Sequence, residues 1–161
     1  MFGVDSHVDP GQSMGFALKR LQQALRSRMD AGLARYGLTT PQYAVLALLA
    51  DQPGISNAEL ARRAFVTPPT MIRIVTTLAE LGLLTRQGTP VEGRARSTRL
   101  TEEGRRRLNA AARAVQQCED LLREQAGPGE RELVLRWLAD CADRLEAPQR
   151  AGVFPDERPG R

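Results

Sequence analysis

The sequence predicts a mainly α-helical fold with one small two-stranded β-hairpin. Three observations predict it. Apolar residues recur at steps of three and four through most of the chain, which is the period of a helix with one buried face. Two helices, the first short and capped, follow one another closely between residues 57 and 81. Two extended stretches then flank a loop rich in Gly, Pro and Arg, over residues 83–100.

The first predicted helix covers residues 12–36. Its apolar stripe consists of Met14, Leu18, Leu21, Leu25, Met29, Leu33 and Tyr36. Gly37 supplies a left-handed stop. The second predicted helix begins near Pro41, with Thr40 as its cap, and ends before Pro53. Because it is apolar on much of its circumference, we expect it to lie at the centre of the fold.

Ser56 and Glu59 have the spacing of a capping box and begin a third predicted helix over residues 57–64. After a tight turn, a fourth predicted helix covers residues 68–81, with Thr67 as its cap.

Residues 83–86 and 97–100 are the predicted strands of the hairpin. Thr101 caps a fifth predicted helix that runs to about Gln125, and a sixth follows over residues 130–146.

This order of helix, turn, helix and hairpin is that of a winged helix-turn-helix, here residues 41–101. The long helices within residues 12–36 and 101–146 cannot bury their apolar stripes on so small a domain, so we expect them to mediate dimerisation. Residues 1–11 are predicted to be a flexible arm. Residues 147–161, rich in Pro, Gly and charge, are predicted to be a disordered tail.

The positive charge is concentrated in the middle of the chain. The net charge is +4, and residues 62–113 carry eleven arginines and four glutamates, or +7. Residues 1–61 are neutral and residues 114–161 carry −3. A basic segment of this kind is typical of a surface that binds a polyanion. An ordinary solvated helix face is the alternative explanation, and charge alone does not separate the two.

The fourth predicted helix is the expected reading element for double-stranded DNA. Its inward stripe consists of Met71, Ile74, Val75 and Leu78. Short polar side chains on its outer face allow close approach to the major groove, where Arg73 can reach guanine or phosphate. Free N–H groups at the start of the third helix suit phosphate, and arginines in the hairpin loop suit the minor groove. The predicted DNA-binding residues are Ser56, Asn57, Thr67, Pro69, Thr70, Arg73, Thr76, Thr77, Arg86, Arg94 and Arg96.

Two segments, from Ala58 to Arg86 and from Glu92 to Gly104, resemble the DNA-binding core of the multiple-antibiotic-resistance regulator (MarR) family. The resemblance extends over residues 12–146. The family usually has Asp-x-Arg in its wing, and here Glu92 stands in place of the Asp before Arg94, which keeps the carboxylate. The loop over residues 87–90 lacks the basic residues that many members carry there.

The resemblance implies a homodimeric repressor that reads a near-palindromic operator and is released by a ligand or an oxidant. The expected dimer interface on the sixth helix consists of Leu133, Val134, Trp137, Leu138 and Cys141. Members of the family often bind small aromatic effectors between the DNA-binding lobe and the dimer helices. The matching positions here are Met14, Leu18, Tyr36 and Tyr43, for which ordinary core packing is the competing explanation.

Other classes of function find little support in the sequence. His7 is the only histidine, and no phosphate loop, nucleophile elbow or metal-ligand spacing is present, so we expect no enzyme, no metal and no cofactor. With neither a signal peptide nor a membrane span, a cytoplasmic protein is expected. Two alternatives remain: a thiol-based redox regulator that uses Cys118 or Cys141, and a winged helix that binds another protein instead of DNA.

Overall fold

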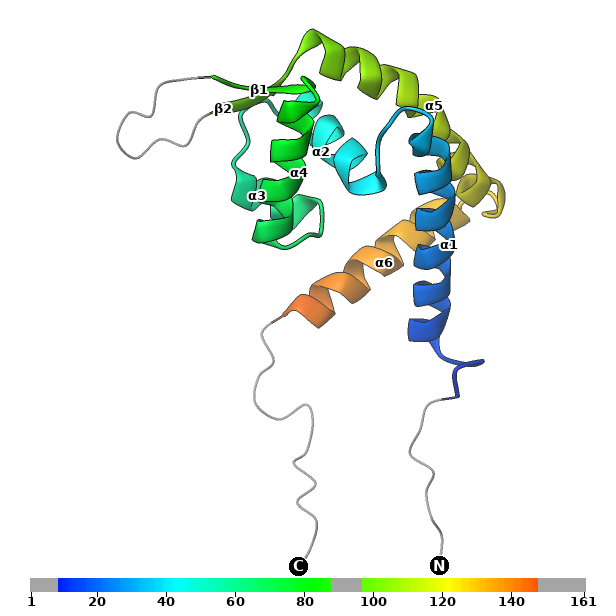
Figure 1. Ribbon diagram of the computed structural model, residues 1–161. Helices are drawn as coiled ribbons and strands as arrows, with labels where there is room; N and C mark the ends of the chain where they lie inside the picture. The colour runs from blue at the N-terminus through cyan, green and yellow to red at the C-terminus, as the bar shows by residue number, and fades with distance from the viewer. Residues whose placement is uncertain (1–8, 88–96, 148–161) are drawn as a thin grey trace, which may run out of the picture. The chain divides into compact units, whose positions relative to one another are not determined.

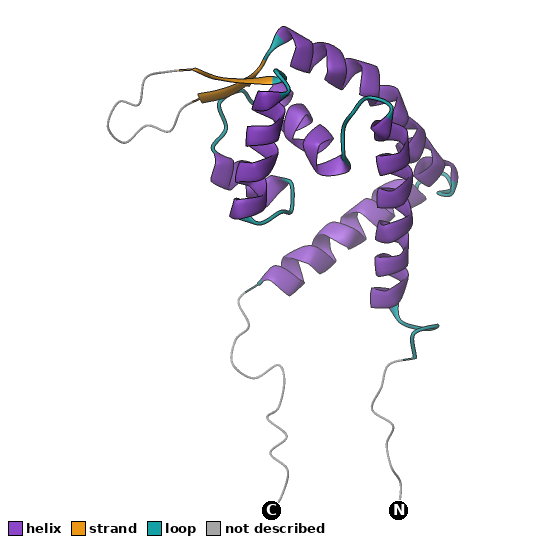
Figure 2. Ribbon diagram, viewed as in Figure 1, coloured by secondary structure: helices purple, strands orange, loops and turns teal. Residues whose placement is uncertain are grey.

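The fold class predicted from the sequence is confirmed by the computed structural model, which describes residues 9–87 and 97–147 (Figure 1). These residues form six helices and one antiparallel hairpin, with the hairpin directly after α4 (Figure 2). The elements are α1 (Met14–Ala34), α2 (Thr40–Asp51), α3 (Asn57–Arg63), α4 (Pro68–Glu80), β1 (Leu84–Gln87), β2 (Ser97–Leu100), α5 (Glu102–Glu124) and α6 (Glu130–Glu146). Most of the predicted arm and nearly all of the predicted tail lie outside the described residues.

The chain divides into two compact units, and the division falls inside α5. The first unit ends at Glu119 and contains α1 to α4, the hairpin and most of α5. The second unit begins at Asp120. It contains the last turn of α5 and the whole of α6, and no residue of α6 is buried.

The second helix lies at the centre of the first unit, as its sequence predicts. Val45, Leu46 and Leu49 of α2 are buried, and α2 contacts α1, α4 and β2. Around it, side chains from α1, α3, α4 and the hairpin complete one apolar core, whose fully buried members include Leu33, Leu60, Met71, Val75, Leu78 and Leu83.

The junction between α1 and α2 differs from the sequence prediction. Thr39, and not Thr40, is the N-cap of α2, because Thr39 and Gln42 form a reciprocal capping box. Thr40 is the first helical residue, and both its amide and its hydroxyl donate to Asp30 Oδ1, at 2.8 and 2.7 Å. These bonds tie the end of α1 to the start of α2. Burial raises the pKa of Asp30, but the bonds from Thr40 and the charge of Arg26 outweigh it and lower the pKa below 3.8.

Phe65 occupies the left-handed position at the end of α3. The amide of Phe65 donates to Arg62 O and that of Val66 donates to Ala61 O, the pair of bonds of a Schellman motif. Glycine normally takes this position, as Gly82 does at the end of α4. Phe65 instead has φ 53°, and the residue is 90% exposed. The backbone strain is therefore not offset by burial of the ring.

The hairpin joins the start of α5 through a backbone clasp, by which we mean the contacts of Thr101 and Gly104 with Gly82 and Leu83. The Thr101 hydroxyl donates to Gly82 O at 2.6 Å, and the Thr101 amide donates to Leu83 O at 3.0 Å. The same hydroxyl accepts from Gly104 N at 3.0 Å, so Thr101 caps α5 as predicted. A Cβ added at Gly104 would lie 2.1 Å from Leu83 O. Only glycine allows so close an approach.

We expect Gly104→Ala to lower the free energy of unfolding by about 2–3 kcal/mol, because the new methyl group must displace a backbone carbonyl. Urea denaturation at fixed protein concentration measures the loss. Gly15→Ala in α1 is the matched control, since its Cβ would lie 3.7 Å from the nearest atom, Ser13 Oγ. The control should be neutral or slightly stabilising. Equal stability of both variants would contradict the clasp.

Replacing Phe65 by Asn should raise the free energy of unfolding by about 0.5–1 kcal/mol, because Asn adopts the left-handed conformation more readily. Phe65→Ala keeps a side chain that disfavours this conformation and should leave the stability nearly unchanged. Thermal denaturation of the three proteins distinguishes the two effects. A loss of stability in both variants would mean that the ring is buried in solution.

Asp30→Asn should remove a stabilisation that depends on pH. The folded-state pKa is lowered, so the carboxylate stabilises the fold above its unfolded pKa, and this contribution is lost as the pH falls through the folded value. The stability gap between wild type and variant should therefore be widest near neutral pH and narrow from about pH 4 downward. Urea denaturation across this range measures the gap. A gap that does not change with pH would contradict the assignment.

Candidate nucleic-acid interface

The outer face of α4 presents a strip of polar side chains on a firmly packed helix. Met71, Val75 and Leu78 are fully buried, and Ile74 packs partly against the same core. The residues predicted to face outward lie on the side of α4 away from these buried residues. Pro69, Arg73, Thr76 and Thr77 are exposed, and Thr70 is half-buried. The side chain of Arg73 forms no ion pair or hydrogen bond with any other described residue. Its guanidinium is thus available to an external acceptor.

The first turn of α4 is different from the capped start that the sequence predicts. Thr67 holds the N-cap position, but its side chain makes no capping bond. Its hydroxyl instead lies 2.9 Å from the Thr70 hydroxyl. Pro68 and Pro69 have no N–H, so this helix start offers phosphate fewer backbone donors than most. The two threonine hydroxyls are the polar groups that it presents.

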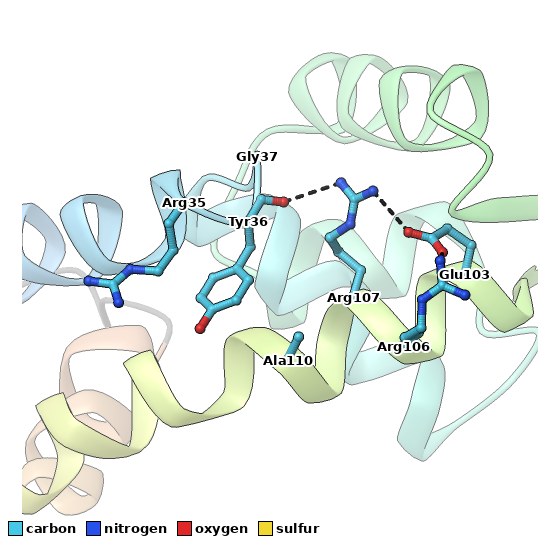
Figure 3. Close-up of a pocket in the computed structure, with 7 residues that line it drawn as sticks. All are labelled: Arg35, Tyr36, Gly37, Glu103, Arg106, Arg107 and Ala110. Carbon is cyan, nitrogen blue, oxygen red and sulfur yellow. Dashed lines mark hydrogen bonds and ion pairs between the residues drawn. The ribbon is translucent and has the colours of Figure 1, made fainter.

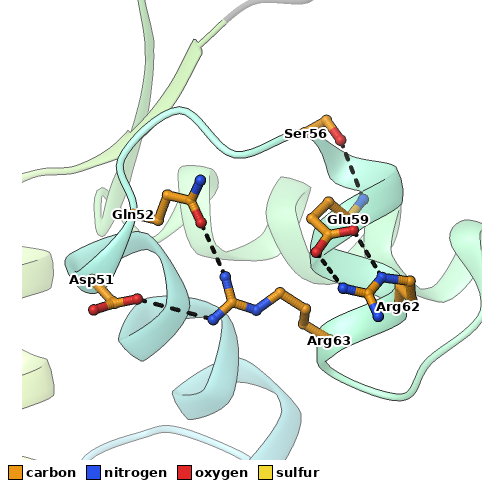
Figure 4. Close-up of polar contacts among 6 residues, drawn as sticks. All are labelled: Asp51, Gln52, Ser56, Glu59, Arg62 and Arg63. Atoms are coloured by element: carbon orange, nitrogen blue, oxygen red, sulfur yellow. Dashed lines mark hydrogen bonds and ion pairs between the residues drawn. The ribbon is translucent and has the colours of Figure 1, made fainter.

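At the start of α3, Ser56 and Asn57 are exposed, as a phosphate contact requires. Only half of the predicted capping box forms: Ser56 Oγ accepts from Glu59 N at 3.2 Å, whereas the Glu59 carboxylate accepts two bonds from Arg62, at 2.8 and 2.6 Å (Figure 4). The bond from Arg62 is the main cause of the lowered pKa of Glu59. The positive charge of Arg62 is therefore partly neutralised within the helix.

Arg63 links α3 to α2 instead of facing outward. Its guanidinium donates to Gln52 Oε1 at 3.1 Å and lies 3.9 Å from the Asp51 carboxylate (Figure 4). Arg106 and Arg107 likewise pair with Glu103 on α5. Several arginines of the basic segment thus have acidic partners, and the free positive charge of the surface is smaller than the sequence count.

The hairpin pairs Leu84 with Leu100 and Arg86 with Thr98. The side chains of Leu84, Thr98 and Leu100 are buried. Arg94 and Arg96, with Glu92 before them, lie outside the described residues, as does the side chain of Arg86. Their contribution to a wing that contacts DNA remains a prediction.

An open hollow of about 430 Å³ lies between the end of α1 and the first turns of α5 (Figure 3). It is lined by Arg35, Tyr36, Gly37, Glu103, Arg106, Arg107 and Ala110. Arg107 spans it, donating to Tyr36 O at 3.2 Å and to Glu103 Oε1 at 2.9 Å. Arg35 is exposed, and its guanidinium makes no bond with another described residue. The hollow therefore combines an aromatic ring with an unpaired cation.

Of the four predicted effector residues, only Tyr36 lines this hollow. Tyr43 is half-buried against the core, and burial raises its pKa above 10. Met14 and Leu18 are exposed in the first turns of α1, roughly 25 Å from its other end at 1.5 Å per residue. The four predicted effector residues therefore do not line a common pocket within one chain. The sequence does not identify Arg35, Glu103 or Arg107 as residues of an effector site. Its only signal is the three- and four-residue spacing of Glu103 from Arg106 and Arg107, which predicts ion pairs along one helix face.

The predicted dimer residues of α6 expose apolar surface within the single chain. Leu133, Val134, Trp137 and Leu138 are 55, 48, 37 and 38% exposed, and Cys141 is partly exposed. Soluble proteins rarely leave such a stripe uncovered. No helix among the described residues is long and apolar enough to cross a membrane. The same residues contain no group of three or more His, Cys, Asp or Glu that could hold a metal ion.

A helix-turn-helix with a polar outer face, followed by a two-stranded hairpin, defines a winged-helix protein of the DNA-binding class. The sequence model of the MarR family matches residues 36–95. A curated relative, the HTH-type transcriptional repressor Rv2887 of Mycobacterium tuberculosis, is 37% identical over 105 residues, which cover 63% of this chain and 76% of the relative. The chain belongs to the MarR family of transcriptional regulators.

Solved structures of the same family agree with this assignment. The transcriptional repressor CouR bound to a 23-mer DNA duplex matches with a TM-score of 0.73 and 31% identity, over 85% of this chain and 99% of that one. Rv2887 in complex with salicylic acid matches with a TM-score of 0.65 and 28% identity, over 86% and 99%. The PcaV regulator of Streptomyces coelicolor, in complex with its natural ligand, matches with a TM-score of 0.76 and 27% identity, over 88% and 99%.

We expect Arg73→Ala to weaken binding to a specific duplex by about 1–3 kcal/mol and to relax the preference for one base pair, if the side chain contacts a base edge. Fluorescence anisotropy with specific and random duplexes measures both effects. Arg113→Ala is the matched control, because Arg113 is exposed on α5 and its loss removes the same charge. An equal loss in both variants would mean that Arg73 acts only through its charge.

Proposed function

We propose that this chain is a ligand-responsive repressor that binds a specific operator in double-stranded DNA as a homodimer, and that it has no enzymatic activity. The observation that carries the proposal is the outer face of α4, where Arg73 and the threonines are exposed on a helix that the core holds rigidly. The match to CouR on a DNA duplex supports it, because that protein has the same winged-helix architecture. We place the protein in the cytoplasm, with the chromosome it would regulate.

The homodimer rests on the uncovered stripe of α6. We propose that Leu133, Val134, Trp137, Leu138 and Cys141 pack against a second copy, which removes their apolar surface from water. Two-fold symmetry would then place two copies of α4 about 34–36 Å apart, in successive major grooves of a near-palindrome.

The effector site that we propose is the hollow beside Tyr36. Rv2887 has been solved with salicylic acid and with p-aminosalicylic acid, which are both aromatic carboxylates. The unpaired guanidinium of Arg35 would attract the carboxylate, and Tyr36 would contact the ring. Such a ligand weakens DNA binding only if it prefers a conformation in which the two reading helices are wrongly spaced.

Selection of bound fragments from genomic DNA, followed by anisotropy at several salt concentrations, tests the proposal. We expect one preferred near-palindromic sequence, bound by two chains, with an affinity that falls as salt rises. Titration of salicylate as a probe should weaken this binding in the wild type and less in Arg35→Ala. Failure to bind any duplex at low salt would exclude the repressor and favour a module that binds another protein.

A thiol switch is the second candidate, because the chain has two free cysteines. Cys118 is only 3% exposed and Cys141 is partly exposed. We expect Cys118→Ala with Cys141→Ser to bind the operator normally and to keep its response to the inducer, because neither thiol is needed for the proposed ligand site. Alanine at position 118 avoids a buried hydroxyl. Loss of the response in the double variant, with DNA binding intact, would support the redox regulator.

A further inference from the structure

Ile72 is an exposed apolar side chain beside the polar strip of α4. It is 54% exposed and lies in the second turn of the helix, next to Arg73 in sequence. Pro69 and Thr76, three residues before it and four after it, are its neighbours on the helix surface, and both are exposed. Its side chain thus adjoins the face that we expect to enter the groove, near the helix end that reaches bases.

The angular position of Ile72 separates it from the buried stripe. Successive residues turn by about 100°, so Ile72 lies roughly a quarter turn from Met71 and about 60° from Val75, at the border of the outer face and on the same side as Thr76. Thr70 and Thr77 lie on the opposite flank. The outer face of α4 therefore has one flank with threonine hydroxyls alone and one flank on which Ile72 adds an aliphatic group beside Thr76. This asymmetry gives the two flanks different chemical preferences.

The major groove offers one apolar group for such a side chain, the C5 methyl of thymine. The other edge groups of the bases are hydrogen-bond donors and acceptors, which an aliphatic side chain would desolvate without replacing their bonds. We propose that Ile72 contacts the C5 methyl of a thymine in each half-site and makes an A·T pair at that position the preferred one. This inference rests on the proposed function, because it requires α4 to lie in the major groove.

Replacement of each operator thymine in turn by deoxyuridine tests the contact, since it removes the methyl group and keeps the base pairing. The duplex is the one obtained by fragment selection with the full-length protein. At one symmetric pair of positions we expect the wild type to lose affinity by about fourfold per methyl group, as burial of one carbon predicts. Ile72→Ala should lose a similar factor on the thymine duplex and show no further loss on the deoxyuridine duplex.

Leu81→Ala is the matched control, because Leu81 is also an exposed apolar residue, 48% exposed, at the opposite end of α4. It should keep the full sensitivity to deoxyuridine. Thermal denaturation should show that both variants are folded, since neither side chain is buried. If the wild type and Ile72→Ala respond alike to every replacement, the contact between Ile72 and thymine is excluded, but the proposed repressor function is not. If the wild type binds no duplex, both the contact and the proposed function are excluded.

Discussion

Two backbone carbonyls, those of Gly82 and Leu83, accept hydrogen bonds from Thr101 at the place where the chain leaves the hairpin and begins α5. These bonds, together with the close approach of Gly104, connect three elements at one point: the end of α4, the first strand and the start of α5. The clasp ties the end of α4 directly to the start of α5, in addition to the contacts that α4 makes with α2, α3 and β1. Such a connection links the reading helix to movements at the start of α5.

The sequence predicted the elements well because their signals are local. Periodic apolar residues, Gly82, the Ser56 cap and the start at Glu130 each mark a boundary through the chemistry of one or two residues. The predicted N-cap of α2 was wrong by one residue. Thr39 and Thr40 can both cap a helix, and only the position of Asp30 in space decides between them. The Gly104 contact was not foreseen, because a glycine within a helix gives no sign of the atom that it approaches.

The candidate site was predicted less completely than the fold, since partners distant in sequence determine which side chains are free. The count of arginines identified the basic segment, but it could not show that Arg63 binds Asp51 and Gln52 while Arg73 remains unpaired. The polar strip of α4 followed from periodicity alone. The hollow beside Tyr36 did not, because its walls come from two segments nearly seventy residues apart.

The backbone clasp contains no atom from the outer face of α4. Gly82 and Leu83 contribute main-chain groups, and Thr101 and Gly104 belong to the start of α5, so the residues that would meet DNA take no part in it. Mutations on the outer face can therefore accumulate without loosening the framework. After a gene duplication, two copies could diverge toward different operators and keep the same response. Because the backbone clasp and the outer face of α4 share no atoms, a change of operator during evolution need not alter the framework of the protein.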